Sequence, residues 1–374
     1  MVESIFAYAG VFGLTIFNSI IIHNGKIRIK GSSGRGSIIG WVLRFAFIFY
    51  PLILFYGFRD HVGTDYQAYL SYYKYLRGNM TIDNIIHSYM EPGYVFLNVI
   101  ADALFEDNFG IFMVSGIVLF GFLYMILSKY KKHINVPMAI FIYCMVCYSF
   151  ACNGVRQSLA AVLVLYAYTY MVERKFWKFL FCLIAASLFH TSAIFCVVFY
   201  LFVYIKPHAQ KLVKILLVAG GGVVLLFQSQ IVAILGTLSL YSVYSTWTGS
   251  GFVSGVSFML YVVPTLALIE IYKGELIKQN PRYETYITLL YVQIPFQCLG
   301  VFNSVMERMA VYCSIVEVIV IPLIYRAITN RKNKASAMLI ITGWFIVYFV
   351  IMNIVLGGND VFPYHFWDFA DSQF

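Results

Sequence analysis

Apolar runs of about twenty residues recur along the whole chain, and they constrain its fold more than any other feature. A helix needs roughly 20 residues, at 1.5 Å each, to cross the hydrocarbon core of a bilayer. The composition agrees, because 61% of the residues are hydrophobic and only 11% are charged, against about 25% charged residues in soluble domains. We therefore expect an all-α, polytopic membrane protein, with about twelve transmembrane helices in a single domain over residues 1–374.

The first apolar run, at about residues 4–22, is expected to stay in the chain. It has no basic region before it and no small-residue cleavage site before Lys26. Both features would mark a cleaved secretory signal peptide. We therefore expect a retained first transmembrane helix.

The basic residues fall in short clusters between the apolar runs, although the net charge is +9. This spacing is typical of the positive-inside rule and not of a nucleic-acid-binding surface. When the chain is threaded so that each cluster lies inside, both termini lie outside. All but five of the 26 Lys and Arg are then cytoplasmic, and the five outward bases are Arg59, Lys74, Arg77, Arg156 and Arg308.

Residues 58–94 form the longest polar stretch of the chain. The charge pattern places this stretch outside as a large loop and predicts a second outward loop at residues 236–253. The apolar segment after Glu91 is about half as long as a spanning helix, and it contains Asn98 and Asp102. We expect a re-entrant or interfacial helix there, which a membrane protein tolerates where protein or water covers the polar groups.

The apolar run at residues 178–206 is too long for one helix and short for two, and both of its ends are basic. A single crossing would place one basic end on the wrong side of the membrane. We therefore predict a hairpin of two short legs that turns at residues 189–192. That turn would leave His190 recessed below the outer surface.

Three of the outward bases, Arg59, Arg156 and Arg308, lie against the ends of predicted spanning helices. Charged residues at such positions are costly unless they are paired or solvated, and they often mark functional sites. A guanidinium pairs well with phosphate oxygens and stays charged. The sequence thus favours an anion site, and the alternative is structural ion pairing of Arg59 with Asp60 and of Arg308 with Glu307.

A carboxylate or a histidine within hydrogen-bond reach of a sugar hydroxyl can act as its general base. Asp65 and Glu91 are the first candidates, and His190 is the third. Each has a structural alternative, because both carboxylates precede a predicted helix that they can cap, and a lone histidine in an apolar hairpin is more often a hydrogen-bonded structural residue. Glu317 lies deep in a predicted helix, where we expect it to be a buried partner of another polar group.

Tyrosines recur through the predicted outward loop, and Tyr94 stands at its end. Their rings offer flat faces for sugars, and aromatic belts at membrane interfaces provide the alternative explanation. The candidate substrate-binding residues are Tyr66, Tyr69, Tyr94 and Gln157.

Motifs of several soluble enzyme classes are absent from the sequence. There is no P-loop, no HExxH and no GxSxG, which argues against an ATPase, a zinc protease or a lipase of these patterns. The seven cysteines lie in or beside apolar runs, and Cys144 and Cys147 form a CxxC without a second pair or a nearby histidine. We expect neither a disulfide framework nor a metal site, and no cofactor.

Six segments, in their order and spacing, resemble the EpsG-like branch of the Wzy-type polysaccharide (O-antigen) polymerases. Each segment is short, but together they extend over most of the chain from Arg59 to Phe366. The segments are RDHVGTDYQAY, EPGYVFLN, NGVRQSLAAVLVLYAY, ASLFHTSAIF, ERMAVYC and FPYHF.

The resemblance implies a GT-C-like glycosyltransferase at the outer (periplasmic) face of the bacterial inner membrane. Such an enzyme moves a growing glycan from undecaprenyl diphosphate to the non-reducing end of a new lipid-linked repeat unit. The resemblance also implies that Arg156, with Arg59 and Arg308, neutralises the departing diphosphate. Asp65 or Glu91 would orient or deprotonate the acceptor hydroxyl, without a metal or a nucleotide sugar.

Two alternatives remain open from the sequence. The first is a lipid-linked oligosaccharide flippase or another transporter, although the sequence has no convincing internal repeat of the kind common in transporters. The second is another lipid-linked sugar transferase, such as an O-antigen ligase. For a polymerase, the expected partners are the lipid-linked donor and acceptor, membrane lipids, a chain-length regulator and a flippase, and no nucleic acid.

Overall fold

The computed structural model describes residues 1–23, 38–227, 230, 251–301 and 307–368. Over these ranges the chain is helical, with one isolated antiparallel bridge between Arg59 and Phe366. Nine helices of this described part are long and apolar enough to cross a membrane. The expected class, an all-α multi-pass membrane protein, is therefore confirmed.

Three further helices occupy the other predicted crossings: α10 (Phe176–Ser187), η2 (Thr191–Tyr204) and α15 (Glu284–Gly300). Helices α10 and η2 correspond to the two short legs predicted for residues 178–206. Because η2 is a 3₁₀ helix, which rises about 2.0 Å per residue, its 14 residues extend about 28 Å. The total of twelve crossings stays a prediction.

The helices form two compact units. The first consists of Met1–Leu163, Ile184–Thr191 and Phe349–Phe374, and the second consists of Val164–Leu183 and Ser192–Tyr348. Helix α9 (Val155–Val172) and helix α10 contribute residues to both units.

In the described part of the first unit, four spanning segments precede α9. They are α1 (Val2–His23), α2 (Ile38–Gly57), α6 (Gly110–Tyr130) and the continuous segment Val136–Asn153, which consists of α7 (Val136–Ile142), η1 (Tyr143–Cys147) and α8 (Tyr148–Asn153). The start of α7 follows from local chemistry, because the Asn135 side chain accepts the Met138 N–H at 3.0 Å and Pro137 has no N–H to satisfy.

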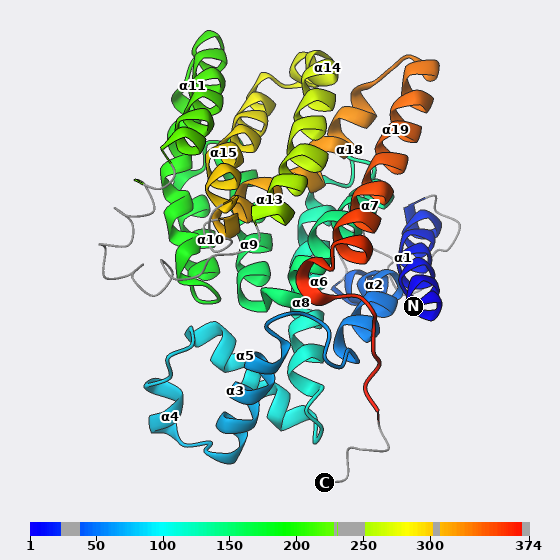
Figure 1. The fold of residues 1–374 in the computed structure, drawn as a ribbon, viewed down its shortest axis with the longest axis vertical. Helices are drawn as coiled ribbons and strands as arrows, with labels where there is room; N and C mark the ends of the chain where they lie inside the picture. The colour runs from blue at the N-terminus through cyan, green and yellow to red at the C-terminus, as the bar shows by residue number, and fades with distance from the viewer. Residues whose placement is uncertain (24–37, 228–229, 231–250, 302–306, 369–374) are drawn as a thin grey trace. The chain divides into compact units, whose positions relative to one another are not determined.

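The outward loop predicted at residues 58–94 contains two helices and leads into a third. They are α3 (Tyr66–Gly78), α4 (Ile82–Ile86) and α5 (Pro92–Leu104), which lie close together in Figure 1. The buried positions of α3 recur every three or four residues, as on one face of a helix, and they include Tyr66, Tyr69 and Tyr73. The side chains of these tyrosines therefore lie in the interior of the first unit.

Helix α5 has 13 residues, which extend about 20 Å and cannot cross a bilayer. Two of its polar side chains contact other protein groups. The Asn98 Nδ2 donates to Tyr94 O at 2.7 Å, and Asp102 forms an ion pair with Arg77 at 2.9 Å, whereas the buried Oδ1 of Asn98 has no hydrogen-bond partner among the described residues. These contacts supply part of the cover that a re-entrant or interfacial helix needs, and its depth in the membrane stays a prediction.

Residues 358–367 return to the loop that follows α2. Gly63 in that loop has φ +107°, and a Cβ on it would lie 2.4 Å from Cys152 O, so only glycine fits there. Three backbone hydrogen bonds of 2.7 to 2.9 Å join residues 58–63 to residues 360–367: Asp60 N–H to His365 O, Gly63 N–H to Asp360 O and Trp367 N–H to Phe58 O. The segment that contains FPYHF therefore fixes the backbone at the start of the polar stretch.

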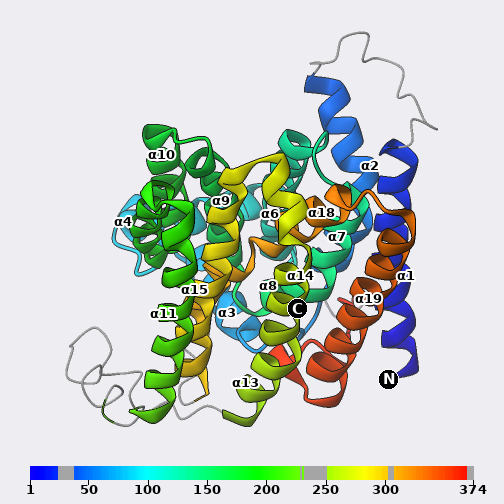
Figure 2. The ribbon, with the colours of Figure 1, turned by 90° about the horizontal axis from the view of Figure 1, so that it is seen from above.

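The second unit is a bundle in which α11 (Pro207–Leu226) lies alongside α15, as Figures 1 and 2 both show. After α14 (Val263–Gln279), the short turn at η5 (Pro281–Tyr283) reverses the chain into α15. The second predicted outward loop, residues 236–253, lies outside the described residues except for its last three positions. Further described helices of this unit are α13 (Gly251–Ser257), η4 (Phe258–Val262), η6 (Arg308–Ala310), α17 (Val311–Ser314), α18 (Glu317–Ala327) and α19 (Arg331–Phe349).

Candidate functional site

The N-terminal end of α5 brings together three residues that the sequence singled out separately. The carboxylate of Glu91 contacts His190 through Oε1, at 3.1 Å from Nδ1, and Arg156 through Oε2 and Nη1. The Thr191 N–H also donates to Oε1, at 3.2 Å. All four residues belong to the first unit, where the outward loop, the start of α9 and the turn after α10 meet.

A close backbone contact explains how α5 reaches the α10 turn. The Gly93 N–H donates to Leu188 O at 2.8 Å, and a Cβ on Gly93 would lie 2.7 Å from the same oxygen. Pro92 can start the helix because it has no N–H to satisfy. Glu91 occupies the N-cap position but makes no side-chain cap hydrogen bond. Its carboxylate therefore contacts His190 and Arg156 and does not cap the helix.

The electrostatics of the cluster fix the state of Glu91. The side chain is 12% exposed, against 25% for Arg156 and 28% for His190. Burial alone would raise the pKa of Glu91, but the hydrogen bond from His190 and the charge of Arg156 lower it to about 2. An ionised carboxylate only accepts hydrogen bonds, so Nδ1 of His190 must be the donor and Nε2 is left as an acceptor in the neutral ring.

Arg156 retains donors beyond its contact with Glu91. A guanidinium has five N–H groups, and the buried Nε–H of Arg156 has no hydrogen-bond partner among the residues that the structure describes. The Tyr69 ring lies beside it, with its centroid 6.0 Å from Cζ. The cluster therefore combines a held imidazole with a guanidinium that has capacity for another anion.

The predicted substrate-binding residues lie inside the first unit. Tyr69 and Tyr94 are buried with their ring centroids 5.5 Å apart, and Gln157 is buried next to Arg156 in the chain. The Tyr66 hydroxyl donates to Asp60 at 3.0 Å. Their part in binding a sugar stays a prediction, since these contacts describe packing.

Asp65 is the N-cap residue of α3, and its side chain makes no cap hydrogen bond. Its backbone N–H donates to Asn153 Oδ1 at 3.0 Å, and Asn153 Nδ2 donates to Asn359 Oδ1 at 3.2 Å. The sequence did not single out either asparagine. Asn359 has φ +59° and the next residue has φ +51°, a strained conformation for non-glycine residues that often accompanies functional sites.

Arg59 is fully buried in the first unit and points into the fold. Its guanidinium stacks on Tyr56 and Phe112, at 3.9 and 4.2 Å from the ring centroids, and Nη1 donates to Tyr56 O at 2.8 Å. A weaker contact of 3.5 Å reaches Cys152 O. These contacts give Arg59 a structural environment, and its part in diphosphate binding stays a prediction.

The remaining charged candidates lie in the second unit. Arg308 is partly buried at the start of η6, and its predicted part in diphosphate binding stays a prediction. The preceding Glu307 accepts a hydrogen bond from Ser254 Oγ at 2.6 Å. Glu317 is fully buried at the first residue of α18, with Tyr261 and Gln293 as polar neighbours.

Comparison with known proteins gives one result that covers most of the chain. No curated protein matches the sequence, and no solved structure matches it. The profile of the EpsG family matches residues 42–366, a range that contains the outward loop and all three residues of the cluster. The chain belongs to the EpsG family.

Proposed function

We propose that this protein polymerises glycans carried on undecaprenyl diphosphate. It transfers the growing glycan from its lipid diphosphate to the non-reducing end of a new lipid-linked repeat unit. The observation that supports this most directly is the contact of Glu91 with both His190 and Arg156 in a multi-pass member of the EpsG family. The cluster contains the two groups that such a transfer needs, a proton acceptor and a cation for the leaving group.

In the proposed reaction, His190 takes the proton of the acceptor hydroxyl on Nε2. The acceptor oxygen then bonds to the anomeric carbon of the donor, while the bond from that carbon to the diphosphate oxygen breaks. Glu91 holds the Nδ1–H and stabilises the imidazolium that forms, as the carboxylate does in a Ser-His-Asp triad. Its pKa of about 2 makes Glu91 itself a weak base at neutral pH. Asp65 is the further candidate for orienting the acceptor.

Arg156 stabilises the departing lipid diphosphate in this scheme. Charge develops on the diphosphate oxygens as the sugar leaves, and a positioned cation is most effective where charge develops. Guanidinium groups also form paired hydrogen bonds with phosphate oxygens. We further propose a GT-C-like architecture with twelve crossings, with the cluster at the outer face of the bacterial inner membrane.

Replacing Arg156 tests the proposal. We expect R156A to reach the membrane but to leave single repeat units on the lipid at the outer face, with polymer formation reduced about 10²- to 10³-fold. The matched control is R77A, which removes another arginine of the outward region that is paired with a carboxylate, Asp102; it should keep long polymer.

Electrophoresis of the lipid-linked glycans, with accessibility labelling of their sugars, separates the possible outcomes. Normal-length polymer from R156A would refute the assignment. Repeat units trapped at the cytoplasmic face would indicate a flippase instead. Long polymer that stays on its lipid carrier would indicate a ligase.

A further inference from the structure

The second unit contains a cavity that plays no part in the proposed transfer. Its volume is about 720 Å³, which is in the range of small-molecule sites. Helices α11, α14 and α15 enclose it. One part of the wall is apolar, and it includes Ile215, Val218 and Ile277; the other part is charged.

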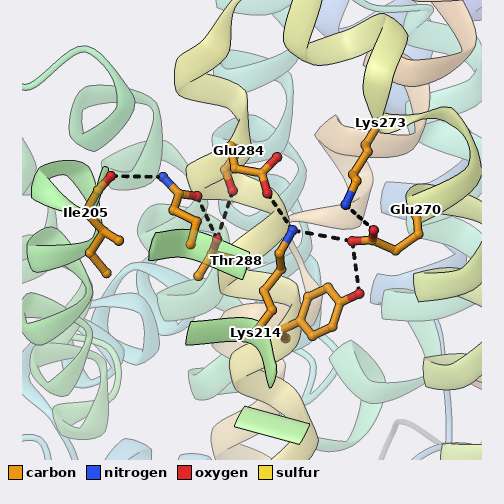
Figure 3. A network of polar contacts seen from close by, with 8 residues as sticks. Ile205, Lys214, Glu270, Lys273, Glu284 and Thr288 are labelled. Carbon is orange, nitrogen blue, oxygen red and sulfur yellow. Dashed lines mark hydrogen bonds and ion pairs between the residues drawn. The ribbon is translucent and has the colours of Figure 1, made fainter. Parts of the chain in front are cut away.

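Figure 3 shows the charged wall, in which Lys214 lies between two carboxylates. Its Nζ contacts Glu284 Oε1 and, at 3.4 Å, Glu270 Oε1. Lys273 pairs with Glu270 Oε2, and the Tyr291 hydroxyl donates to Oε1 of the same residue at 3.0 Å. Buried charges on spanning helices are costly and often functional, so this network requires an explanation.

The network leaves one buried oxygen without a donor. The side chains of Lys214 and Glu284 are only 7% and 10% exposed. Two lysines and two glutamates balance in charge, but Oε2 of Glu284 has no hydrogen-bond partner among the described residues. A buried carboxylate oxygen without a donor is expensive. Because Glu284 lines the cavity, the occupant that best satisfies it carries an N–H cation.

The cavity opens on the apolar face of α11. Ile215 and Val218 line it and are 54% and 50% exposed. Exposed apolar side chains on a spanning helix face lipid tails, so the open side is accessible from the bilayer. Lys211 also lines the cavity and is exposed, one helical turn before Lys214. The occupant therefore has apolar chains and a polar headgroup.

We propose that this cavity binds a phospholipid whose headgroup carries a phosphate and a primary ammonium, as in phosphatidylethanolamine. The ammonium donates to Oε2 of Glu284. The phosphate pairs with Lys211 and Lys273, and the acyl chains follow Ile215 and Val218. A headgroup without a primary ammonium makes no charged hydrogen bond to Oε2 of Glu284, and the quaternary ammonium of phosphatidylcholine has no N–H to donate.

The first test uses the purified full-length protein in detergent and lipids with identical acyl chains. We expect phosphatidylethanolamine at saturation to raise Tm by about 3 °C, as binding with a ligand concentration near 100 Kd does in a chain of 374 residues. Its affinity should exceed that of phosphatidylcholine about tenfold or more, with N-methylated lipids in between and phosphatidylglycerol without the effect. Equal shifts from phosphatidylethanolamine and phosphatidylcholine would overturn the proposal.

The second test changes the protein. In E284Q the carboxylate charge is lost, and the preference for phosphatidylethanolamine should disappear. Because E284Q also removes one of the two charged partners of Lys214 and can impair folding, V218F provides an independent variant that fills the cavity from the apolar part of its wall. Its matched control is L216F, which lies on another face of α11, is also exposed and is outside the cavity lining.

V218F should unfold at the Tm of L216F without lipid, but only L216F should respond to phosphatidylethanolamine. A lipid response of V218F equal to that of L216F would show that the lipid acts elsewhere and would refute the proposed site. Retention of the headgroup preference by a folded E284Q would refute the role of Glu284.

Discussion

Glu91 offers a quantitative test of the candidate site. Its pKa would rise by burial alone, but the hydrogen bond from His190 and the charge of Arg156 bring it from the ordinary 4.5 to about 2. One pKa unit corresponds to about 1.36 kcal/mol, so the folded state favours the ionised carboxylate by about 3 kcal/mol. Because the folded pKa lies below the unfolded one, this stabilisation is present above pH 4.5 and is lost as the pH falls toward 2.

The substitution E91Q removes the charge and nearly preserves the shape. We expect it to lower the free energy of unfolding at pH 7 by up to about 3 kcal/mol. Activity should fall further, because an amide can donate to Nδ1 of His190 and favour the wrong tautomer. The equivalent change in a Ser-His-Asp triad lowers the rate about 10⁴-fold. The control E91D keeps the charge and should retain part of both properties.

Two assays check these expectations. Thermal unfolding of the purified protein in detergent, from pH 7 to pH 3, should show a flatter pH dependence for E91Q than for the wild type. If both proteins lose the same stability on acidification, the electrostatic argument is wrong. The length of the lipid-linked polymer then tests activity, and full-length polymer from E91Q would refute the role of Glu91 in orienting His190.

Two further substitutions separate structural from chemical roles. G93A should destabilise the protein by about 1 to 3 kcal/mol and shorten the polymer, because the new Cβ meets the fixed Leu188 O at 2.7 Å; G78A, which has open space around it, is its control in thermal unfolding. R59K should lower Tm, because a lysine loses the fork and the ring stacking of Arg59. A fully stable but inactive R59K would instead support direct diphosphate binding.

The spanning helices could be predicted because their signal is local. Twenty apolar residues bounded by bases identify a crossing without any knowledge of its neighbours, and α1 (Val2–His23) covers the first run, predicted at about residues 4–22. The short legs around His190 were also recognisable, since the basic ends of that run required an even number of crossings.

The contacts of the site could not be predicted, because they join segments far apart in the chain. Glu91 and His190 are separated by 99 positions, and Asn153 and Asn359 by 206. The capping role left open for Glu91 was a local expectation, and tertiary contacts overrode it. In the second unit, Lys214 and Lys273 contributed to the sequence argument only as topology markers, whereas the structure pairs Lys214 with the buried Glu284 and Lys273 with the half-buried Glu270.

Arg59 and Arg156, the two candidate diphosphate-binding arginines of the first unit, differ in the groups that they contact. Arg59 contacts carbonyl oxygens and aromatic faces, which carry no net charge. An incoming diphosphate therefore does not compete with another anion for Arg59. Arg156 is held by a carboxylate, for which a diphosphate is an anionic competitor with more charge. If the diphosphate draws Arg156 away from Glu91, the carboxylate keeps its hydrogen bonds from Nδ1 of His190 and from the Thr191 N–H. We therefore expect donor binding to exchange the contact of Arg156 with Glu91 for a contact with the diphosphate, while His190 stays in place.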